Sequence, residues 1–410
     1  MKTVKILATV FIILVFISSA IAGGVINLPK TGQTTIYAAG DDGDLQKGIT
    51  WPSPRFTWTV CGAIDNLTGL MWQDHSGFYL TSDGARDYVS SINSRNNGPC
   101  DYHDWHLPTV NEFESLMNLG EADQTVWLKT QGFDGITSSY WASLGYSEFP
   151  AWEAVMTYGT IRQSTNKNHI MLVRKAIDGP ARVWETRFGN NESLDSGVDW
   201  PSQRFTDNGN GTVTDNLTGL IWLKDANCIQ SKYSSFDKEG YADGKVSWQR
   251  ALDFIVGINN GMYPNCGAGL TDWRLPNRKE LWSLTGSNLS YTFTNASFNV
   301  SHNYWTSSTN ARFTDGSVAW VINMGTGEIK YYVKSNYYDA GYVWPVRGGI
   351  DSGTFALTVV KAGAGSGTVI SNSSDIDCGL NCSGIYSSGT VVTLTATPDI
   401  GSALDGRRLA

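Results

Sequence analysis

Polar and hydrophobic residues alternate over short distances along most of the chain, and each half also contains one longer stretch with a helical period. In these two stretches, apolar residues recur at i, i+3, i+4 and i+7 after Ser82 and after Ser247. This spacing places them on one face of a helix, and serine is a favourable N-cap residue. The predicted inward-facing residues are Ala85, Tyr88, Val89 and Ile92 in the first helix and Ala251, Phe254, Ile255 and Ile258 in the second.

A shorter helix is predicted in each half by a capping box. Thr109 is followed by Glu112, and Asn277 by Glu280, just before an apolar run. In this arrangement the first side chain accepts a hydrogen bond from a backbone N–H of the first turn, and the acid reaches back to the cap backbone. We therefore expect helices to begin directly after Thr109 and Asn277.

Short runs rich in aromatic and β-branched residues predict strands in the remainder of both halves. The glycines of segment 207–211 (DNGNG) are free to take positive φ, which predicts a tight hairpin turn. The expected strands are 140–143, 152–157 and 170–174 in the first half and 304–308, 317–323, 328–333 and 343–347 in the second.

Four sequence words occur twice, and they occur in the same order. Matching words lie about 150 to 170 residues apart, which indicates a duplicated domain rather than a short-period solenoid. The pairs are 64–72 (IDNLTGLMW) and 214–222 (TDNLTGLIW), 104–108 (DWHLP) and 272–276 (DWRLP), 140–143 (YWAS) and 304–307 (YWTS), and the dipeptides Val173-Arg174 and Val346-Arg347.

The chain has 410 residues, which exceeds the size of one ordinary hydrophobic core. We expect an α+β protein of two units, each with two helices against twisted antiparallel strands, followed by a small all-β module. The predicted segments are a signal peptide (1–22), a leader (23–50), a first unit (51–177), a linker (178–198), a second unit (199–349), the β module (354–400) and a disordered tail (401–410).

The N-terminus has the pattern of an export signal. Lys2 and Lys5 precede an apolar run at 6–17, and Ala20-Ile21-Ala22 fits the small-residue cleavage rule. The alternative is an uncleaved anchor helix, because 6–22 approaches the length that spans a bilayer. After cleavage no membrane span is expected, and the predicted location is the periplasm, cell surface or exterior.

Composition restricts the class of partner. The chain is 41% hydrophobic and 17% charged, which is typical of a globular protein. Its formal charge is −8, and loss of the two signal lysines changes this to −10. An acidic average surface argues against nucleic acid as a partner.

Six cysteines in an exported chain predict disulfides. The chain contains no CxxC pair, so a zinc site is disfavoured. Six cysteines allow fifteen connectivities, and the simplest keeps each bridge within its segment. The predicted bridges are Cys61–Cys100, Cys228–Cys266 and Cys378–Cys382.

Motifs of established catalytic chemistry are missing from the sequence, which has no HExxH, GxSxG or Walker pattern. His103 and His106 suggest a metal pair, but Arg274 stands at the place of His106 in the second unit, which favours a surface or packing role. The Asp-rich segments 41–44 and 207–210 are interpreted as a solvated turn and a hairpin turn. No cofactor is expected, and calcium is left open at 207–210.

Repeated aromatic and charged residues have structural and functional interpretations. The tryptophans at matched places indicate core packing, with stacking platforms for sugar rings as the alternative. Asp65, Asp215, Arg174 and Arg347 are interpreted as buried ion pairs or turn anchors. The tryptophan pairs are Trp72 and Trp222, Trp105 and Trp273, Trp141 and Trp305, and Trp152 and Trp320.

The motifs at 204–222, 272–281, 304–308 and 346–349 resemble the Lcl C-terminal-domain family, whose function is largely unknown and which is named for a collagen-like bacterial adhesin. The resemblance implies a C-type-lectin-like or formylglycine-generating-enzyme-like fold for both units. The family's named member binds sulfated glycosaminoglycans on host surfaces. The C-terminal segment resembles a truncated bacterial surface β-repeat module.

The resemblance and the export signal predict a non-catalytic surface or adhesion protein that binds glycan or a cell-surface protein. Alternatives are an enzyme on the formylglycine-generating scaffold, which needs a reactive cysteine pair, and a purely structural envelope protein. Oligomeric state is left open. The candidate ligand-binding residues, on two loops of the second unit, are Trp305, Asn323, Lys334, Asn336 and Tyr337.

Overall fold

A computed structural model places the chain in two compact units, Gly23–Ile350 and a second unit of Met1–Ala22 with Asp351–Ala410. The structure describes residues 8–15, 26–94, 99–143, 151–176, 197–237, 243–285, 303–336, 339–348, 355–363, 366–371, 376–378, 383–386, 393–399 and 402–404.

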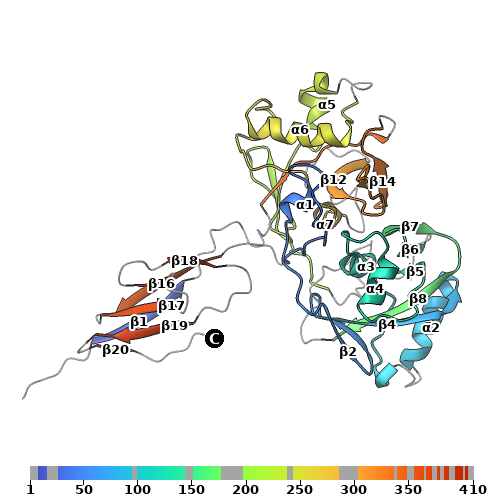
Figure 1. The fold of residues 1–410 in the computed structure, drawn as a ribbon, viewed down its shortest axis with the longest axis horizontal. Coiled ribbons are helices and arrows are strands. Elements are labelled where there is room, and N and C mark those ends of the chain that lie inside the picture. The colour runs from blue at the N-terminus through green and yellow to red at the C-terminus, as the bar shows by residue number, and fades with distance from the viewer. Residues whose placement is uncertain are drawn as a thin grey trace, which may run out of the picture. The chain divides into compact units, whose positions relative to one another are not determined.

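The first sequence copy forms a seven-stranded sheet in the order β2-β3-β4-β8-β5-β6-β7 (Figure 1). All neighbouring strands pair antiparallel except β5 and β8, which pair parallel. The strands are β2 (Phe56–Thr59), β3 (Gly62–Asp65), β4 (Leu70–Leu80), β5 (Ser139–Ala142), β6 (Ala151–Val155), β7 (Thr160–Ser164) and β8 (Asn168–Lys175).

Helices cover both faces of this sheet. Side chains alternate between the faces of a strand, and on β8 Leu172 packs with α2 (Ser82–Ser94), whereas Met171 and Val173 pack with α3 (Val110–Leu116). The short helix α4 (Gln124–Thr130) joins the α3 side, where its Trp127 and Leu128 are buried. The sheet is therefore a buried central layer.

The second copy has a four-stranded sheet in the order β15-β11-β10-β9 and a three-stranded sheet in the order β12-β13-β14. Both sheets are antiparallel within the described residues. The elements are β9 (Phe205–Asp207), β10 (Thr212–Asp215), β11 (Ile221–Leu223), α5 (Cys228–Lys232), the 3-10 helix η2 (Ser234–Phe236), α6 (Trp248–Asn259), α7 (Arg278–Ser283), β12 (Asn303–Thr309), β13 (Val318–Asn323), β14 (Ile329–Val333) and β15 (Val346–Arg347).

The helix starts test the sequence predictions directly. Both capping boxes are present, with Thr109 capping α3 and Asn277 capping α7. The helix α2 is present, but its cap is Thr81 rather than Ser82, because the Thr81 hydroxyl accepts from the Gly84 N–H at 3.2 Å. Ser247 precedes α6 as predicted, although its side chain makes no capping hydrogen bond.

The leader corrects another prediction. Instead of a solvated turn at 41–44, the chain forms the short helix α1 (Asp42–Leu45), and the Asp41 side chain caps it by accepting from the Asp44 N–H. Asp41 and Asp42 are 0% and 2% exposed. The leader is therefore part of the folded core of Gly23–Ile350, not a tether.

The two copies contact each other through matched residues. A Cβ added to Gly159 would lie 3.6 Å from the ring of Trp320, and one added to Gly327 would lie 3.5 Å from the ring of Trp152. Gly159 and Gly327 occupy the same place in the β6–β7 and β13–β14 hairpins. The contact thus has the reciprocal form of a two-fold interface, built within one chain.

Charged residues are buried where α3 meets α7. Arg278 Nη2 lies 2.6 Å from Glu114 Oε2, and Lys279 Nζ donates to the carbonyl of Glu114 at 2.6 Å. In the matched contact, Trp282 Nε1 donates to Asn111 Oδ1 at 3.1 Å. All five side chains are at most 3% exposed, so the two copies share one dehydrated polar interface.

The compact unit of Met1–Ala22 with Asp351–Ala410 contains two small sheets, ordered β18-β16-β1-β20 and β17-β19. The strand β1 (Ala8–Val15) lies within the segment predicted as a signal peptide and pairs antiparallel with β16 (Phe355–Gly363). Its run of branched aliphatic residues suits a strand. The other strands are β17 (Gly367–Ser371), β18 (Ser383–Tyr386), β19 (Leu394–Pro398) and β20 (Ser402–Leu404).

Among the described residues, no helix has the length and apolar character needed to cross a bilayer.

Candidate functional site

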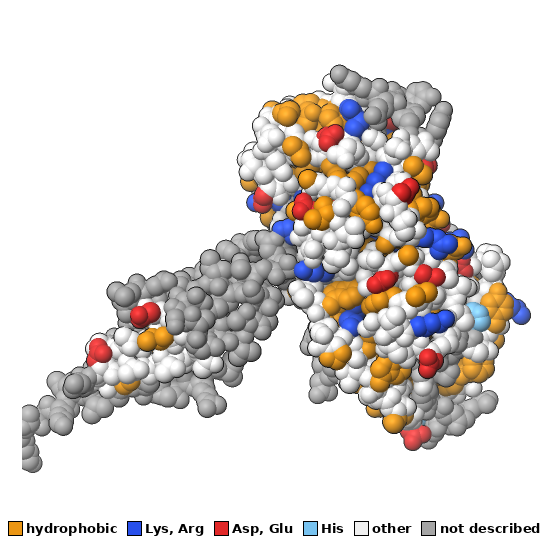
Figure 2. All heavy atoms as spheres, viewed as in Figure 1, with side chains coloured by type: hydrophobic (Ala, Val, Ile, Leu, Met, Phe, Trp, Pro, Cys, Tyr) orange, Lys and Arg blue, Asp and Glu red, His pale blue; other side chains and the backbone are white. Residues whose placement is uncertain are grey.

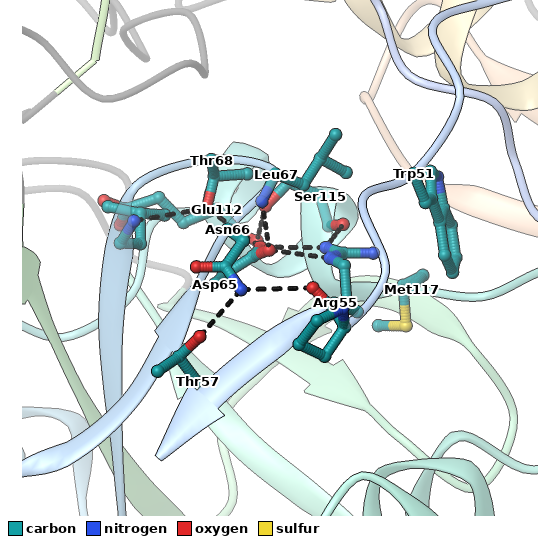
Figure 3. Close-up of polar contacts among 12 residues, drawn as sticks. Trp51, Arg55, Thr57, Asp65, Asn66, Leu67, Thr68, Glu112, Ser115 and Met117 are labelled. Carbon is teal, nitrogen blue, oxygen red and sulfur yellow. Dashed lines mark hydrogen bonds and ion pairs between the residues drawn. The ribbon is translucent and has the colours of Figure 1, made fainter. Parts of the chain in front are cut away.

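In the first copy, Asp65, one of the repeated aspartates, forms a buried ion pair with Arg55 (Figure 3). Arg55 Nε and Nη2 lie 2.6 and 2.8 Å from Asp65 Oδ1 and Oδ2. The same Nη2 donates to the carbonyl of Ser115 at the end of α3. Asp65 also accepts from the Leu67 N–H and the Thr68 hydroxyl, both at 2.9 Å. The pair therefore anchors the turn before β4 and joins it to α3, which confirms the turn-anchor interpretation of Asp65. Arg174 and Arg347 instead pair with the more exposed Asp104 and Asp272.

The second copy repeats this arrangement. Arg204 pairs with Asp215 at 3.2 and 3.3 Å and donates to the carbonyl of Ser283. In each copy a tryptophan ring lies against the guanidinium, Trp51 at 4.5 Å in the first and Trp200 at 4.0 Å in the second. Both arginines are stacked and buried, so the motif holds the fold and offers no accessible charge.

His106 has the structural place of Arg274. Its Nε2 lies 3.0 Å from Glu112 Oε1, and Arg274 makes two hydrogen bonds of 2.6 Å with the matching Glu280. His103 is exposed. Within the part of the chain that the structure describes, no group of three or more His, Cys, Asp or Glu could hold a metal ion. The packing interpretation of His106 is confirmed.

The repeated tryptophans lie in the core, as predicted. Trp305, which we also considered as a ligand-binding residue, is 0% exposed, and its Nε1 donates to the carbonyl of Val246 at 2.7 Å. A ring enclosed in this way cannot stack on an external sugar, so Trp305 is removed from the candidate surface. All eight are at most 5% exposed: Trp72, Trp105, Trp141, Trp152, Trp222, Trp273, Trp305 and Trp320.

The other candidate ligand residues are dispersed. Asn323 accepts from the N–H groups of Gly325 and Thr326 and so closes the β13–β14 turn. Asn336 donates to Asp339 at 3.3 Å. Tyr337 lies outside the described residues. The remaining candidate, Lys334, follows β14 and faces a cavity.

This cavity has a volume of about 450 Å³ and is formed by four segments that are distant in sequence. The leader contributes one aromatic wall, and the start of α6 contributes the other. The loop between β12 and β13 and the end of β14 complete it. The lining residues are Tyr37, Ser247, Trp248, Gln249, Asp315, Gly316, Lys334 and Ser335.

The Lys334 ammonium is held against one wall of the cavity. Its Nζ lies 3.6 Å from the centre of the Trp248 ring and donates to Thr309 Oγ1 at 2.7 Å. Burial lowers the pKa of Lys334 to about 8, and the nearby carboxylates of Asp41 and Asp315 oppose this shift. A lysine that is partly dehydrated beside a cavity is typical of a functional position.

The leader holds the Tyr37 wall in place. The backbone N–H of Tyr37 donates to Asp41 Oδ2 at 2.9 Å, and Gln33 exchanges two 3.0 Å hydrogen bonds with the backbone of Thr309. The Tyr37 ring covers Gly316, where an added Cβ would lie 2.3 Å away. Sequence reasoning missed Tyr37 and Trp248, since neither lies in a repeated functional motif.

A second cavity, of about 530 Å³, lies beside the β9–β10 hairpin and the Cys228–Cys266 bridge. Its Lys224 is paired with Asp207 at 2.6 Å, and its Asp225 accepts from Ser231. These partners occupy two of its three charged groups, and the third, Lys232, is exposed. We therefore place the candidate site at the first cavity, where the lysine is partly buried.

Two of the predicted disulfides are present. Cys61–Cys100 and Cys228–Cys266 have Cα–Cα distances of 5.6 and 5.9 Å and join residues 39 and 38 positions apart. Cys378 is disulfide-bonded, and its predicted partner Cys382 lies outside the described residues. Disulfides of this kind are typical of an oxidising compartment.

These features define a duplicated α+β domain with one disulfide in each copy. The model of the Lcl C-terminal domain matches residues 62–174 and 211–347, which together make up more than half of the chain. The chain belongs to the Lcl C-terminal domain family, with one matched segment in each copy. No curated protein matches the chain.

Proposed function

We propose that the chain is an exported, non-catalytic surface or adhesion-type protein that binds a glycan or a cell-surface protein at the cavity formed by Tyr37, Trp248 and Lys334. The sequence pattern of the first 22 residues and the two disulfides support export.

The observation that carries the proposal is the composition of the cavity. It places two aromatic residues, one amine, one carboxylate and three neutral polar side chains around a space of about 450 Å³. Small-molecule and sugar sites combine apolar ring surface with a few polar groups in this way. We also propose a C-type-lectin-like fold for each copy, which the helices packed on mainly antiparallel strands support.

The distribution of charge favours a neutral or mixed ligand. On the face of Gly23–Ile350 shown in Figure 2, Lys and Arg side chains are interspersed with Asp and Glu. A long polyanion binds best to a continuous basic surface. Our proposal therefore places recognition in the cavity rather than on this broad face.

A glycan and matrix-protein array with the full mature chain tests the proposal. We expect a specific signal that Tyr37→Ala and Lys334→Gln each weaken, whereas Lys330→Gln has no effect because Lys330 is an exposed residue paired with Glu328. Binding that is unchanged by both cavity variants would refute the cavity as the site. Silence across the arrays would favour the structural envelope role.

The enzyme alternative rests on a reactive cysteine pair. In the described residues Cys228 and Cys266 are bonded to each other, which supports a structural staple. Thiol titration of the native protein discriminates the two functions, since two rapidly reacting thiols in the second copy would favour the enzyme.

A further inference from the structure

We propose that Lys334 is a reactive amine that forms a reversible Schiff base with a small aldehyde, such as the open-chain form of a short sugar, inside the cavity. The chemistry requires only the cavity and the amine. It therefore stands or fails independently of the surface binding proposed above.

The first argument is the set of partners around Nζ. The hydrogen-bond partner of Lys334 is the neutral hydroxyl of Thr309, and its closest ring is Trp248. Two other lysines of this protein are paired with carboxylates: Lys330 lies 2.7 Å from Glu328, and Lys224 lies 2.6 Å from Asp207. A carboxylate partner holds a lysine in its charged form, whereas a hydroxyl can also donate to the neutral amine.

The second argument is access. Lys334 lines the cavity and is only partly buried, so an aldehyde of a few atoms can approach Nζ. Lys279 provides the internal comparison. Burial also lowers the pKa of Lys279 to about 8, but its Nζ is enclosed and donates to the carbonyls of Glu114 and Met117. Lys334 combines dehydration with an open path.

The third argument is the fraction of Lys334 that is neutral and therefore able to act as a nucleophile. With a pKa of about 8, about a quarter of Lys334 is neutral at pH 7.5. For an ordinary lysine, with a pKa near 10.4, the neutral fraction is about one in a thousand. Dehydration of a lysine beside an apolar surface is a recognised way to produce a Schiff-base amine.

The reaction is balanced without a further reagent. The Nζ lone pair forms a bond to the carbonyl carbon, and the C=O π electrons move to oxygen. A proton transfers from nitrogen to that oxygen and gives a carbinolamine. The hydroxyl then takes up the proton that the Lys334 ammonium released to solvent and leaves as water, which gives the protonated imine, and hydrolysis reverses each step.

Trapping with glycolaldehyde and cyanoborohydride tests the proposal on the full chain. Peptide mass mapping at pH 7.5 should show Lys334 alkylated at least tenfold faster than Lys330, with Lys279 unmodified. The roughly 200-fold larger neutral fraction is partly offset because a less basic amine is a weaker nucleophile. The Lys334 rate should rise with pH to a plateau above about 8. Equal or faster labelling of Lys330 overturns the proposal, as does a Lys334 rate that climbs without a plateau to pH 10.

Two variants separate the amine from the fold. Lys334→Arg keeps the charge and the ring contact but should abolish rapid trapping, whereas Lys330→Arg should leave Lys334 trapping unchanged. Thermal melting of each variant verifies that the fold is retained. If rapid incorporation persists in Lys334→Arg, another nucleophile is responsible and the assignment is wrong.

Discussion

Asp65 receives hydrogen bonds from Arg55, Leu67 and Thr68 within one buried turn. Replacing Asp65 with Asn removes the charge that balances Arg55, which is only 5% exposed. We expect a loss of about 3–5 kcal/mol in the free energy of unfolding, because a buried guanidinium loses its carboxylate. Urea denaturation followed by tryptophan fluorescence measures this change.

The matched control is Lys224→Gln, which breaks the partly exposed pair with Asp207. Exposed pairs contribute about 0–1 kcal/mol, so this variant should resemble the wild type. Equal effects of the two variants would contradict the assignment of Asp65 as an anchor.

Asp42 makes the stability of the leader depend on pH. Burial raises the pKa of Asp42 from 3.8 to about 7, while hydrogen bonds from Ser308 and Thr31 lower it and the charges of Glu280 and Asp41 raise it. Between about pH 4 and pH 7, the Asp42 carboxyl therefore keeps its proton in the folded state and loses it in the unfolded chain. This contribution to stability is complete below pH 4 and is lost as the pH rises to about 7, by at most about 1.4 kcal/mol per pH unit.

Asp42→Asn should remove this dependence. Melting temperatures should be compared at pH 5 and pH 7.5. The difference between the variant's melting temperature and that of the wild type should move in favour of the variant at the higher pH. Parallel curves for the two proteins would show that Asp42 is ionised in the folded state throughout.

At the scale of helices and strands, local signals were sufficient where the partners lie close in sequence. The capping boxes at Thr109 and Asn277 each join residues three apart, and both helices begin as predicted. The helix α4 was missed because its polar start, Asp123 and Gln124, carries no capping box or long apolar period. Elements held mainly by tertiary contacts leave a weaker local pattern.

The disulfide of the first copy should stabilise its sheet against unfolding. Cys61 follows β2, and Cys100 lies after α2, so the bridge closes a loop that contains β3, β4 and α2. In the double variant Cys61→Ser and Cys100→Ser, loss of a 39-residue constraint should cost about 4 kcal/mol by loop entropy. Reversible urea denaturation tests this value. A shift below about 1 kcal/mol would mean that the bridge restricts the unfolded chain little.

At the scale of the whole molecule, the features that the sequence did not reveal are those that join distant segments. Arg278, Lys279 and Glu114 have the polarity of surface residues, yet their partners lie in the other copy. The candidate site is also formed by segments that are distant in sequence. Of its walls only Lys334 lay in a predicted loop, because Tyr37 arrives from the leader and Trp248 from a helix assigned to the core.

The interface between the copies can be tested by Glu114→Ala. Arg278, which is 0% exposed, then loses its carboxylate, and we expect a cost of about 3–5 kcal/mol. Calorimetry should show the single transition of Gly23–Ile350 separating into two as the copies uncouple. Glu328→Gln, at an exposed pair, is the control and should melt as the wild type does. One unshifted transition in Glu114→Ala would contradict the coupling.

The reciprocal contacts of Gly159 with Trp320 and of Gly327 with Trp152 have a consequence for protein engineering. A single copy that is fused to another protein would expose one of these rings together with the charged side chains of α3 or α7 that are buried here. A chimera that exchanges one copy for a relative must therefore bring a hairpin turn that packs against each retained tryptophan. The two copies therefore depend on each other for stability, and we expect only the pair to keep its fold when it is moved into another protein.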